Sequence, residues 1–355
     1  MPLFCETLAI FPSLCYHDYS RIYKERGIIM IRDFKDKVAF ITGSASGIGS
    51  GIAHACAKHG MKVCIVDKRE DALQEAMKWY EERGYDATAI PLDVTDREAY
   101  AKAADKAEEV YGKIHLLVNN AGVSAGRNAW DSTWNDWDFI MSINCMGVVN
   151  GIKTIVPRML KHGEEAHVVS TSSTGGVFAV DGCALYNTTK FFVSGLMECC
   201  AADLQVTNVG ASVLYPGPTN SQLGISSAAV RPDALKNKGE LPFAPPPRKE
   251  GEEAPKMPAF PDFTNIFMTP DELGERVIMG VQRGDIFIWT HPEFKAGAQC
   301  RNDAQIRAIP DEPLTAKRKE RAEALKFFGS LTYNPVYEKQ TTPPGLKEDW
   351  DRSKE

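Results

Sequence analysis

Short apolar runs that end in a polar or turn residue recur along the chain, and stretches of helical pattern separate them. Lys37–Ile41, Lys62–Val66 and His115–Val118 are apolar and β-rich, as expected for strands buried on both faces of a sheet. Between the first two, Ile48–His59 has helical character. An order in which strands and helices alternate predicts an α/β fold.

A glycine-rich turn, Thr42-Gly-Ser-Ala-Ser-Gly-Ile-Gly49, follows the first predicted strand. Its glycines lie at Gly43, Gly47 and Gly49, a spacing that differs from the usual Gly-x-Gly-x-x-Gly dinucleotide fingerprint. Glycine allows the backbone to turn sharply and to approach a ligand closely. A strand–turn–helix unit also directs free backbone N–H groups toward a pyrophosphate. The turn alone also fits other α/β proteins.

An acidic residue, Asp67, ends the second predicted strand about twenty residues beyond the glycines. A carboxylate here can accept hydrogen bonds from the adenosine ribose hydroxyls and would repel a 2′-phosphate. An Asp that simply ends a strand is the structural alternative. Lys68 and Arg69 follow directly and could attract a phosphate. The position therefore favours NAD and leaves NADP open.

Tyr186 and Lys190 are one helical turn apart in Tyr186-Asn-Thr-Thr-Lys190, so their side chains would share a helix face. A phenol with a pKa near 10 is a poor base at neutral pH. A nearby ammonium group favours the phenolate and would bring the tyrosine pKa toward the working range of an acid–base catalyst. Each motif is weak alone, but a Tyr–Lys pair downstream of a dinucleotide-type turn indicates an oxidoreductase.

From about Phe34 to Phe294 the chain resembles the short-chain dehydrogenase/reductase family. The resemblance implies a single doubly wound Rossmann-type domain with a parallel seven-stranded sheet. It implies a catalytic set of Asn144, Ser173, Tyr186 and Lys190, in which Ser173 lies thirteen positions before Tyr186. Ser173 would hydrogen-bond the substrate oxygen, Lys190 would also reach the nicotinamide ribose, and Asn144 would hold a water that passes the proton outward. Taken singly, each of these residues also fits an ordinary structural role.

The same resemblance implies the cofactor contacts. Asp93 follows the third strand, where the family contacts the adenine, Asn119–Gly122 follows the fourth, and Pro216-Gly217 follows the sixth, beside the nicotinamide. The full implied set is Gly43, Ser46, Gly47, Ile48, Gly49, Asp67, Asp93, Val94, Asn120, Ala121, Gly122, Tyr186, Lys190, Pro216, Gly217, Thr219 and Ser221.

Composition narrows the class of protein. The formal net charge is −6 over 355 residues with no long basic run, which predicts no nucleic-acid or anionic-membrane partner. No apolar stretch approaches the ~20 residues of a membrane span. Nine scattered cysteines without Cys-x-x-Cys, and seven histidines without His-Glu-x-x-His, predict a reduced, cytoplasmic protein with no metal site. No Gly-x-Ser-x-Gly elbow is present, which argues against an α/β-hydrolase.

A long insertion between Pro218 and Met268 departs from the family pattern, and seven of the 21 prolines fall between Pro242 and Pro261. A long segment of this kind in a compact domain is usually a lid, a binding loop or disordered. We expect an enlarged lid at about 218–268, with a solvated linker as the alternative. A helix start at Thr269–Glu272 and a last strand at Asp285–Thr290 follow it.

The ends of the chain frame the predicted domain organisation. Residues 1–29 are expected to form a loose extension without the pattern of a signal peptide, and residues 30–294 the catalytic domain. Residues 295–355 are expected to form a tail with one helix, at Thr315–Phe328.

Within the family, the chain looks most similar to the Cα-dehydrogenases of bacterial lignin β-aryl-ether breakdown, on the segments Asp33–Thr42, Asp93–Tyr100, Gly147–Pro157 and Thr290–Glu293. That resemblance implies NAD-dependent oxidation of a benzylic secondary alcohol to an aryl ketone. An aromatic pocket could be lined by Trp130, Trp134, Phe178, Phe243 and Phe260, although aromatic residues are more often plain packing.

Two other functions compete. One is an NADPH-dependent carbonyl or hydroxysteroid-type reductase, and the other is a dinucleotide-binding sensor without activity. The complete catalytic set argues against the sensor, because family sensors commonly lose the tyrosine.

The family also implies a homodimer or homotetramer that pairs the helices at about 134–161 and 183–204.

Overall fold

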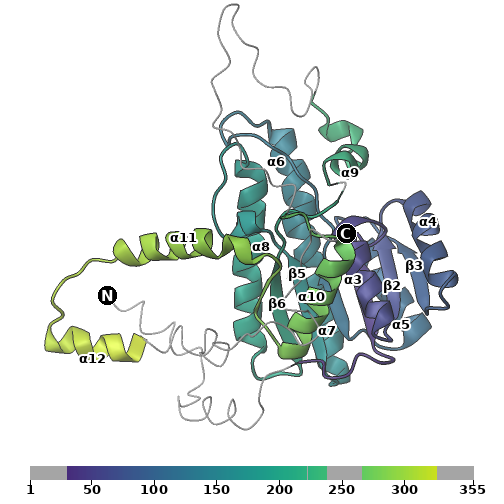
Figure 1. Ribbon diagram of the computed structural model, residues 1–355, viewed down its shortest axis with the longest axis horizontal. Helices are drawn as coiled ribbons and strands as arrows, with labels where there is room; N and C mark the ends of the chain where they lie inside the picture. The colour runs from purple at the N-terminus through teal and green to yellow at the C-terminus, as the bar shows by residue number, and fades with distance from the viewer. Residues whose placement is uncertain (1–29, 222, 238–265, 326–355) are drawn as a thin grey trace, which may run out of the picture.

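The computed structural model describes residues 30–221, 223–237 and 266–325, and in that part of the chain seven parallel strands form one sheet (Figure 1). The strand order is β3-β2-β1-β4-β5-β6-β7. The strands are β1 Val38–Thr42, β2 Lys62–Asp67, β3 Ala87–Pro91, β4 Leu116–Asn119, β5 Ala166–Thr171, β6 Val209–Tyr215 and β7 Phe287–Trp289. The predicted doubly wound, seven-stranded parallel sheet is confirmed.

Helices cover both faces of this sheet, because successive strand residues point to opposite sides. Phe40 and Val66 enter one hydrophobic cluster, and Ile41 and Ile65 enter another. The first cluster also takes residues from α5 (Arg97–Tyr111), α7 (Val148–His162) and α8 (Ala184–Leu204). The second takes residues from α3 (Gly47–Lys58), α4 (Glu70–Glu81) and α10 (Pro270–Arg283).

The glycine-rich helix α3 packs unusually close to α10. A Cβ atom on Gly51 would lie 1.9 Å from the Pro270 carbonyl oxygen, so only glycine permits this approach. The predicted helix start is confirmed: Thr269 and Glu272 form a capping box at the beginning of α10. The contact between the two helices fixes the start of α3 relative to the sheet.

One long helical stretch, Trp134–His162, runs beside the sheet. It consists of α6 (Trp134–Met141), a π-helical segment η2 (Ser142–Gly147) and α7. By length and composition it is the one helix among the described residues that could cross a membrane, but more than half of its apolar window is buried inside the protein. A core helix of a folded domain passes the same test.

Beyond β7 the structure differs from the sequence prediction. After a short turn η6 (Pro292–Phe294), the tail contains two helices, α11 (Lys295–Arg307) and α12 (Ala316–Leu325), where we predicted one. No residue of α11 is buried, so its sequence has no apolar stripe that would reveal a helix. Figure 1 shows both helices reaching away from the sheet.

Three predicted segments lie wholly or partly outside the described residues. They are the N-terminal extension (1–29), most of the proline-rich insertion (238–265) and the end of the tail (326–355). Of the insertion, the structure describes two short helices, α9 (Leu223–Val230) and η4 (Asp233–Leu235), and the return at 266–268.

Candidate active site

A cleft of about 530 Å³ opens at the carboxyl ends of the strands, around the point where the strand order reverses between β1 and β4. This is where open α/β sheets bind their ligands. Its two ends differ in character. We call the end beside the β1–α3 turn, β2 and β4 the glycine-turn half. The other end we call the apolar half, lined by Val123, Phe139, Leu223, Val230, Pro232, Leu235 and Phe267.

Glycine is required in the glycine-turn half for two physical reasons. Gly43 and Gly47 have φ angles of +65° and +58°, in the left-handed region that favours glycine. Gly49 has an ordinary φ angle, but a Cβ atom there would lie 2.2 Å from the Gly43 carbonyl oxygen. The turn therefore presents bare backbone to the cleft while the first turn of α3 packs directly behind it.

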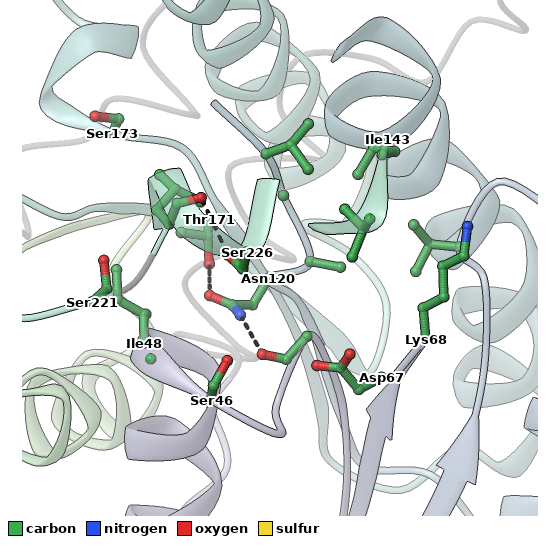
Figure 2. A pocket seen from close by; sticks show the side chains of 18 of the residues that line it. Ser46, Ile48, Asp67, Lys68, Asn120, Ile143, Thr171, Ser173, Ser221 and Ser226 are labelled. Carbon is green, nitrogen blue, oxygen red and sulfur yellow. Dashed lines mark hydrogen bonds between the residues drawn. The ribbon is translucent and has the colours of Figure 1, made fainter. Parts of the chain in front are cut away.

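Asn120 ties the turn to the neighbouring strands, and Figure 2 shows it in the middle of the cleft between Asp67 and Ser173. Its side-chain amide donates to the Thr42 and Gly43 carbonyls at 3.2 and 3.3 Å. Its oxygen accepts from the Thr171 hydroxyl at 3.2 Å. The Thr42 hydroxyl in turn accepts from the Asn120 backbone N–H at 3.0 Å. These bonds hold the ends of β1, β4 and β5 in one rigid edge.

Charged residues close the far end of the glycine-turn half. The Asp67 carboxylate is 7% exposed and pairs with Arg69, whose guanidinium also donates to Ser46 at 2.9 Å. Lys68 forms an ion pair with Asp93 at 2.7 Å. Burial alone would raise the pKa of Asp93, but Lys68 and Thr95 outweigh it and hold that pKa below its ordinary value.

Ser173, Tyr186 and Lys190 lie where the two halves of the cleft meet, and all three line it. Tyr186 and Lys190 come from one face of α8, as their spacing predicts. The Lys190 ammonium donates to the Thr171 carbonyl at 2.9 Å and lies 5.4 Å from the centre of the Tyr186 ring. Ser173 follows β5 and caps a single 3₁₀ turn, η3 (Thr174–Gly176).

The electrostatic prediction for this pair is wrong in direction. Burial raises the pKa of Tyr186, and the Ser173 hydroxyl counteracts this only in part. Burial also lowers the pKa of Lys190 to about 8. Because both groups are buried, each loses hydration of its charged form, and this loss is the largest cause of both pKa shifts.

Asn144 does not line the cleft, unlike the other three predicted catalytic residues. It is 1% exposed and lies in the π-helical segment η2. Its side-chain oxygen accepts from the Val123 N–H at 2.8 Å, and its amide donates to the Val123 carbonyl and the Thr189 hydroxyl at 2.9 and 3.0 Å. Its side chain thus links the β4–α6 loop to the helix that carries Tyr186.

Every predicted cofactor contact except Gly49 lines the cleft. Sequence reasoning missed most of the apolar half, together with the polar residues Thr171, Ser172, Ser142 and Ser226. Phe139, Ser142 and Ile143 lie just before Asn144 on the same helical stretch, and that proximity was the available signal. In the part of the chain that the structure describes, no group of three or more His, Cys, Asp or Glu residues could hold a metal ion.

The aromatic residues proposed from the sequence are not those of the cleft. Trp130 and Trp134 are each 83% exposed, and Phe178 stacks against Phe294. None of these three lines the cleft, and Phe243 and Phe260 lie outside the described residues. Phe139 and Phe267 are the phenylalanines that line it.

A buried histidine after β7 holds both described ends of the insertion. Nδ1 of His291 accepts from the Gly217 N–H at 3.2 Å. Its Nε2 lies 3.0 and 2.9 Å from the carbonyl oxygens of Pro218 and Ile266, to which it donates when Nδ1 accepts. His291 thereby joins the Pro216-Gly217 wall of the cleft to the point where the insertion returns.

Comparison with known proteins agrees with this geometry. The family model described as short chain dehydrogenase matches residues 37–231. The C alpha-dehydrogenase of Sphingobium sp. (strain SYK-6) is 34% identical over 301 residues, which cover 84% of this chain and 95% of that protein.

Two solved structures have the same fold. A short-chain dehydrogenase/reductase from Burkholderia phymatum in complex with NAD is 30% identical, with a TM-score of 0.69 over 80% of this chain and all of that one. LigO from Sphingobium sp. strain SYK-6 is 33% identical, with a TM-score of 0.66 over 83% of this chain and 98% of that one.

Proposed function

The chain belongs to the short-chain dehydrogenase/reductase family of oxidoreductases, and from this premise we propose that it oxidises a bulky, aromatic secondary alcohol with NAD. One observation carries the proposal. Ser173, Tyr186 and Lys190 line the junction between a polar cleft half that ends at Asp67 and an apolar half. A hydride acceptor and an apolar alcohol would meet at that junction.

The glycine-turn half fits a dinucleotide. Gly43 and Gly47 leave the backbone bare at the start of α3, where the helix dipole favours a pyrophosphate. The Asp67 carboxylate stands where it can accept from ribose hydroxyls and repel a 2′-phosphate. NAD supplies the hydride acceptor when it is bound. The NAD complex of the Burkholderia phymatum relative supports the same choice of cofactor.

The residues at the junction would divide the remaining work. Ser173 would donate to the substrate oxygen and hold it against the Tyr186 oxygen, which would accept the alcohol's proton as the phenolate, after releasing its own proton to solvent. Lys190 would hold the nicotinamide ribose and stabilise the tyrosine once it has lost its own proton. Asn144 would act through structure, since both N–H donors of its amide and one bond to its oxygen join Val123 to the Tyr186 helix.

The apolar half supports a bulky substrate, because seven apolar residues line it, and Ser142, Ser173 and Ser226 line the same cleft. Pockets of this kind bind ligands by apolar contact and orient them by a few polar groups. The similarity to a C alpha-dehydrogenase supports an aryl alcohol in particular.

A screen for NAD reduction across small secondary alcohols, aryl glycerol ethers and steroid alcohols tests the proposal. We expect the highest kcat/KM with an aryl alcohol and NAD. The alternative, an NADPH-dependent reductase, is favoured by one observation: Lys68 and Arg69 also line the cleft. The proposal would be refuted if turnover required NADP(H). It would also be refuted if no alcohol were turned over.

We also propose a homodimer or homotetramer that pairs the outer faces of α7 and α8. Met146 in η2, Leu160 in α7 and Phe192 in α8 are 38%, 40% and 38% exposed, and a symmetric interface would remove this apolar surface from water. Light scattering at micromolar concentration should give at least twice the chain mass of 39.2 kDa. A monomer would contradict the assembly and leave the proposed reaction untouched.

A further inference from the structure

One wall of the apolar half comes from a segment that belongs to no strand of the sheet. The segment that contains α9 and η4 contributes Val230, Pro232 and Leu235 to the cleft. Figure 1 shows α9 outside the strands of the sheet. The position of these residues therefore depends on what ties this segment to the body of the protein. Among the described residues, two polar attachments join it to the β4–α6 region.

The first attachment is a single hydrogen bond at the start of the segment. The Ser124 N–H donates to the Ser227 hydroxyl at 2.8 Å, and that hydroxyl donates to the Leu223 carbonyl within α9. It holds α9 near Val123 but leaves the later residues, which line the cleft, to a second attachment.

The second attachment centres on Arg231, which lies between Val230 and Pro232. Its guanidinium forms an ion pair with Asp136 at 2.8 Å, and its Nε donates to the Leu235 carbonyl at 2.8 Å. The guanidinium carbon also lies 5.1 Å from the centre of the Phe139 ring. The two charged side chains are only 12% and 5% exposed, so solvent screens the pair little.

Asp136 has further partners that close the arrangement from the other side. It accepts from the Thr133 N–H at 3.1 Å, as expected for the third residue of a capped helix. It also accepts from the Asn237 amide at 3.0 Å, and the Thr133 hydroxyl donates to the Asn237 side-chain oxygen at 2.8 Å. A single buried carboxylate thus holds both Arg231 and the end of the described segment.

These contacts reach the junction of the cleft through packing. Phe139 belongs to a small buried hydrophobic cluster with Val123, Ile140 and Leu185, and Tyr186, Val230 and Leu235 pack against it. Because the ion pair fixes Phe139 on one side and the α9–η4 wall on the other, it determines how much space remains between them.

We propose that Arg231 and Asp136 form a clasp that fixes the α9–η4 wall to α6 and sets the width of the substrate pocket. They are positioning residues, since neither lines the cleft. The proposal rests on the proposed function for the nature of the substrate. It does not depend on that function for the attachment of the wall, which can be measured separately.

Hydrogen exchange measures the attachment without any turnover. Arg231→Met and Asp136→Asn should each speed exchange of backbone amides in residues 223–237 at least about tenfold, because each breaks the buried ion pair that holds the segment. The other cation beside Asp136, Arg127 at 4.0 Å, lies before α6 and does not hold this segment. Arg283→Met is the matched control. Arg283 pairs with Asp285, a carboxylate 2% exposed just before β7, at the end of the strands away from the cleft, and its loss should leave 223–237 unchanged.

Kinetics measure the consequence for the substrate. In both clasp variants, KM for an aryl glycerol ether should rise roughly tenfold, while kcat for a small secondary alcohol and the Kd of NAD change less than about twofold. Arg231→Lys keeps the positive charge but loses the planar guanidinium. Its KM for the aryl glycerol ether should therefore rise less than that of Arg231→Met. A simple loss of folded protein would instead lower kcat equally for both alcohols.

Unchanged exchange in 223–237, or an equal rise of KM for small and bulky alcohols, would overturn the clasp. A wild-type protein that oxidises no alcohol would refute the proposed function alone. The exchange comparison would then still decide whether the wall is held by this ion pair.

Discussion

The two halves of the cleft are built in opposite ways. The glycine-turn half is formed by strand ends and exposed backbone. Gly43 and Gly47 have positive φ angles, and the side chain of Asn120 joins three strands. In the apolar half, side chains from α6, α9 and η4 meet far from the sheet, and a buried ion pair between Arg231 and Asp136 joins them.

The difference separates what must stay fixed from what can vary. Residues at strand ends inherit their positions from the sheet, which two hydrophobic clusters hold from both faces. The wall of the apolar half is held in position by a few side-chain contacts. A fold of this kind can keep its chemistry while changing its substrate, because the two depend on separate parts of the structure.

The junction between the halves should show the largest effect of any single substitution. Tyr186→Phe removes only the hydroxyl that exchanges a proton with the substrate, so kcat should fall roughly 10²–10⁴-fold. The Kd of NAD should stay within about twofold, since neither half of the cleft is altered. Steady-state kinetics and fluorescence titration of NAD would measure the two quantities. Turnover close to wild type would remove Tyr186 from the mechanism.

The pH dependence of stability should show that Lys190 is buried at the junction. Its pKa in the folded protein is lowered to about 8 from 10.5, so between these pH values the unfolded chain binds a proton that the folded protein does not. Stability of the wild type relative to Lys190→Met should therefore rise by a few kcal/mol as pH increases through this window.

Urea unfolding of both proteins at several pH values would measure that rise. Lys161→Met, which changes an exposed lysine and keeps Lys190, should reproduce the wild-type pH dependence. Parallel curves for wild type and Lys190→Met would mean that Lys190 is hydrated in solution.

The same comparison explains what could be predicted from the sequence. The sheet, the glycine turn, Asp67 and the Tyr186–Lys190 pair were all predictable, because each depends on a local pattern or follows directly from a strand. Arg231 and Asp136 were not predictable, since they lie far apart in the chain and nothing in their local sequence links them.

Two further differences have physical causes. Trp130 and Trp134 could have lined an aromatic pocket, but residue type alone does not fix a side chain's position: both are exposed, and Phe139 and Phe267 line the cleft. The direction of the Tyr186 pKa shift depends on burial, which spacing along a helix does not reveal.

One substitution made in each half tests the contrast directly. In Gly49→Ala the new Cβ would lie 2.2 Å from the Gly43 carbonyl oxygen, so the turn must shift at a cost of about 1–3 kcal/mol. In Gly224→Ala on α9 the Cβ meets no atom within 4 Å, and alanine favours the helix.

We expect NAD affinity and melting temperature to fall for Gly49→Ala and neither to fall for Gly224→Ala. Calorimetry with and without NAD would measure both effects. Equal losses in the two variants would show that the glycine-turn half is no more rigid than the other.

The smallest effect should come from the far end of the glycine-turn half, where Asp67 lies beside the two cations Lys68 and Arg69. Wild-type protein should bind NAD more tightly than NADP, because a 2′-phosphate would lie beside a carboxylate that is only 7% exposed. Asp67→Ala should reduce the ratio of the NADP Kd to the NAD Kd about tenfold, mainly by tightening NADP binding, since Arg69 would lose its carboxylate partner and could pair with the phosphate.

Arg69→Ala is the opposing control and should increase the same ratio of Kd values. Equilibrium titration of each variant with both nucleotides measures it, at constant ionic strength because these charges are partly exposed. If wild type prefers NADP, Lys68 and Arg69 rather than Asp67 decide the cofactor, and this end of the cleft selects phosphate instead of excluding it.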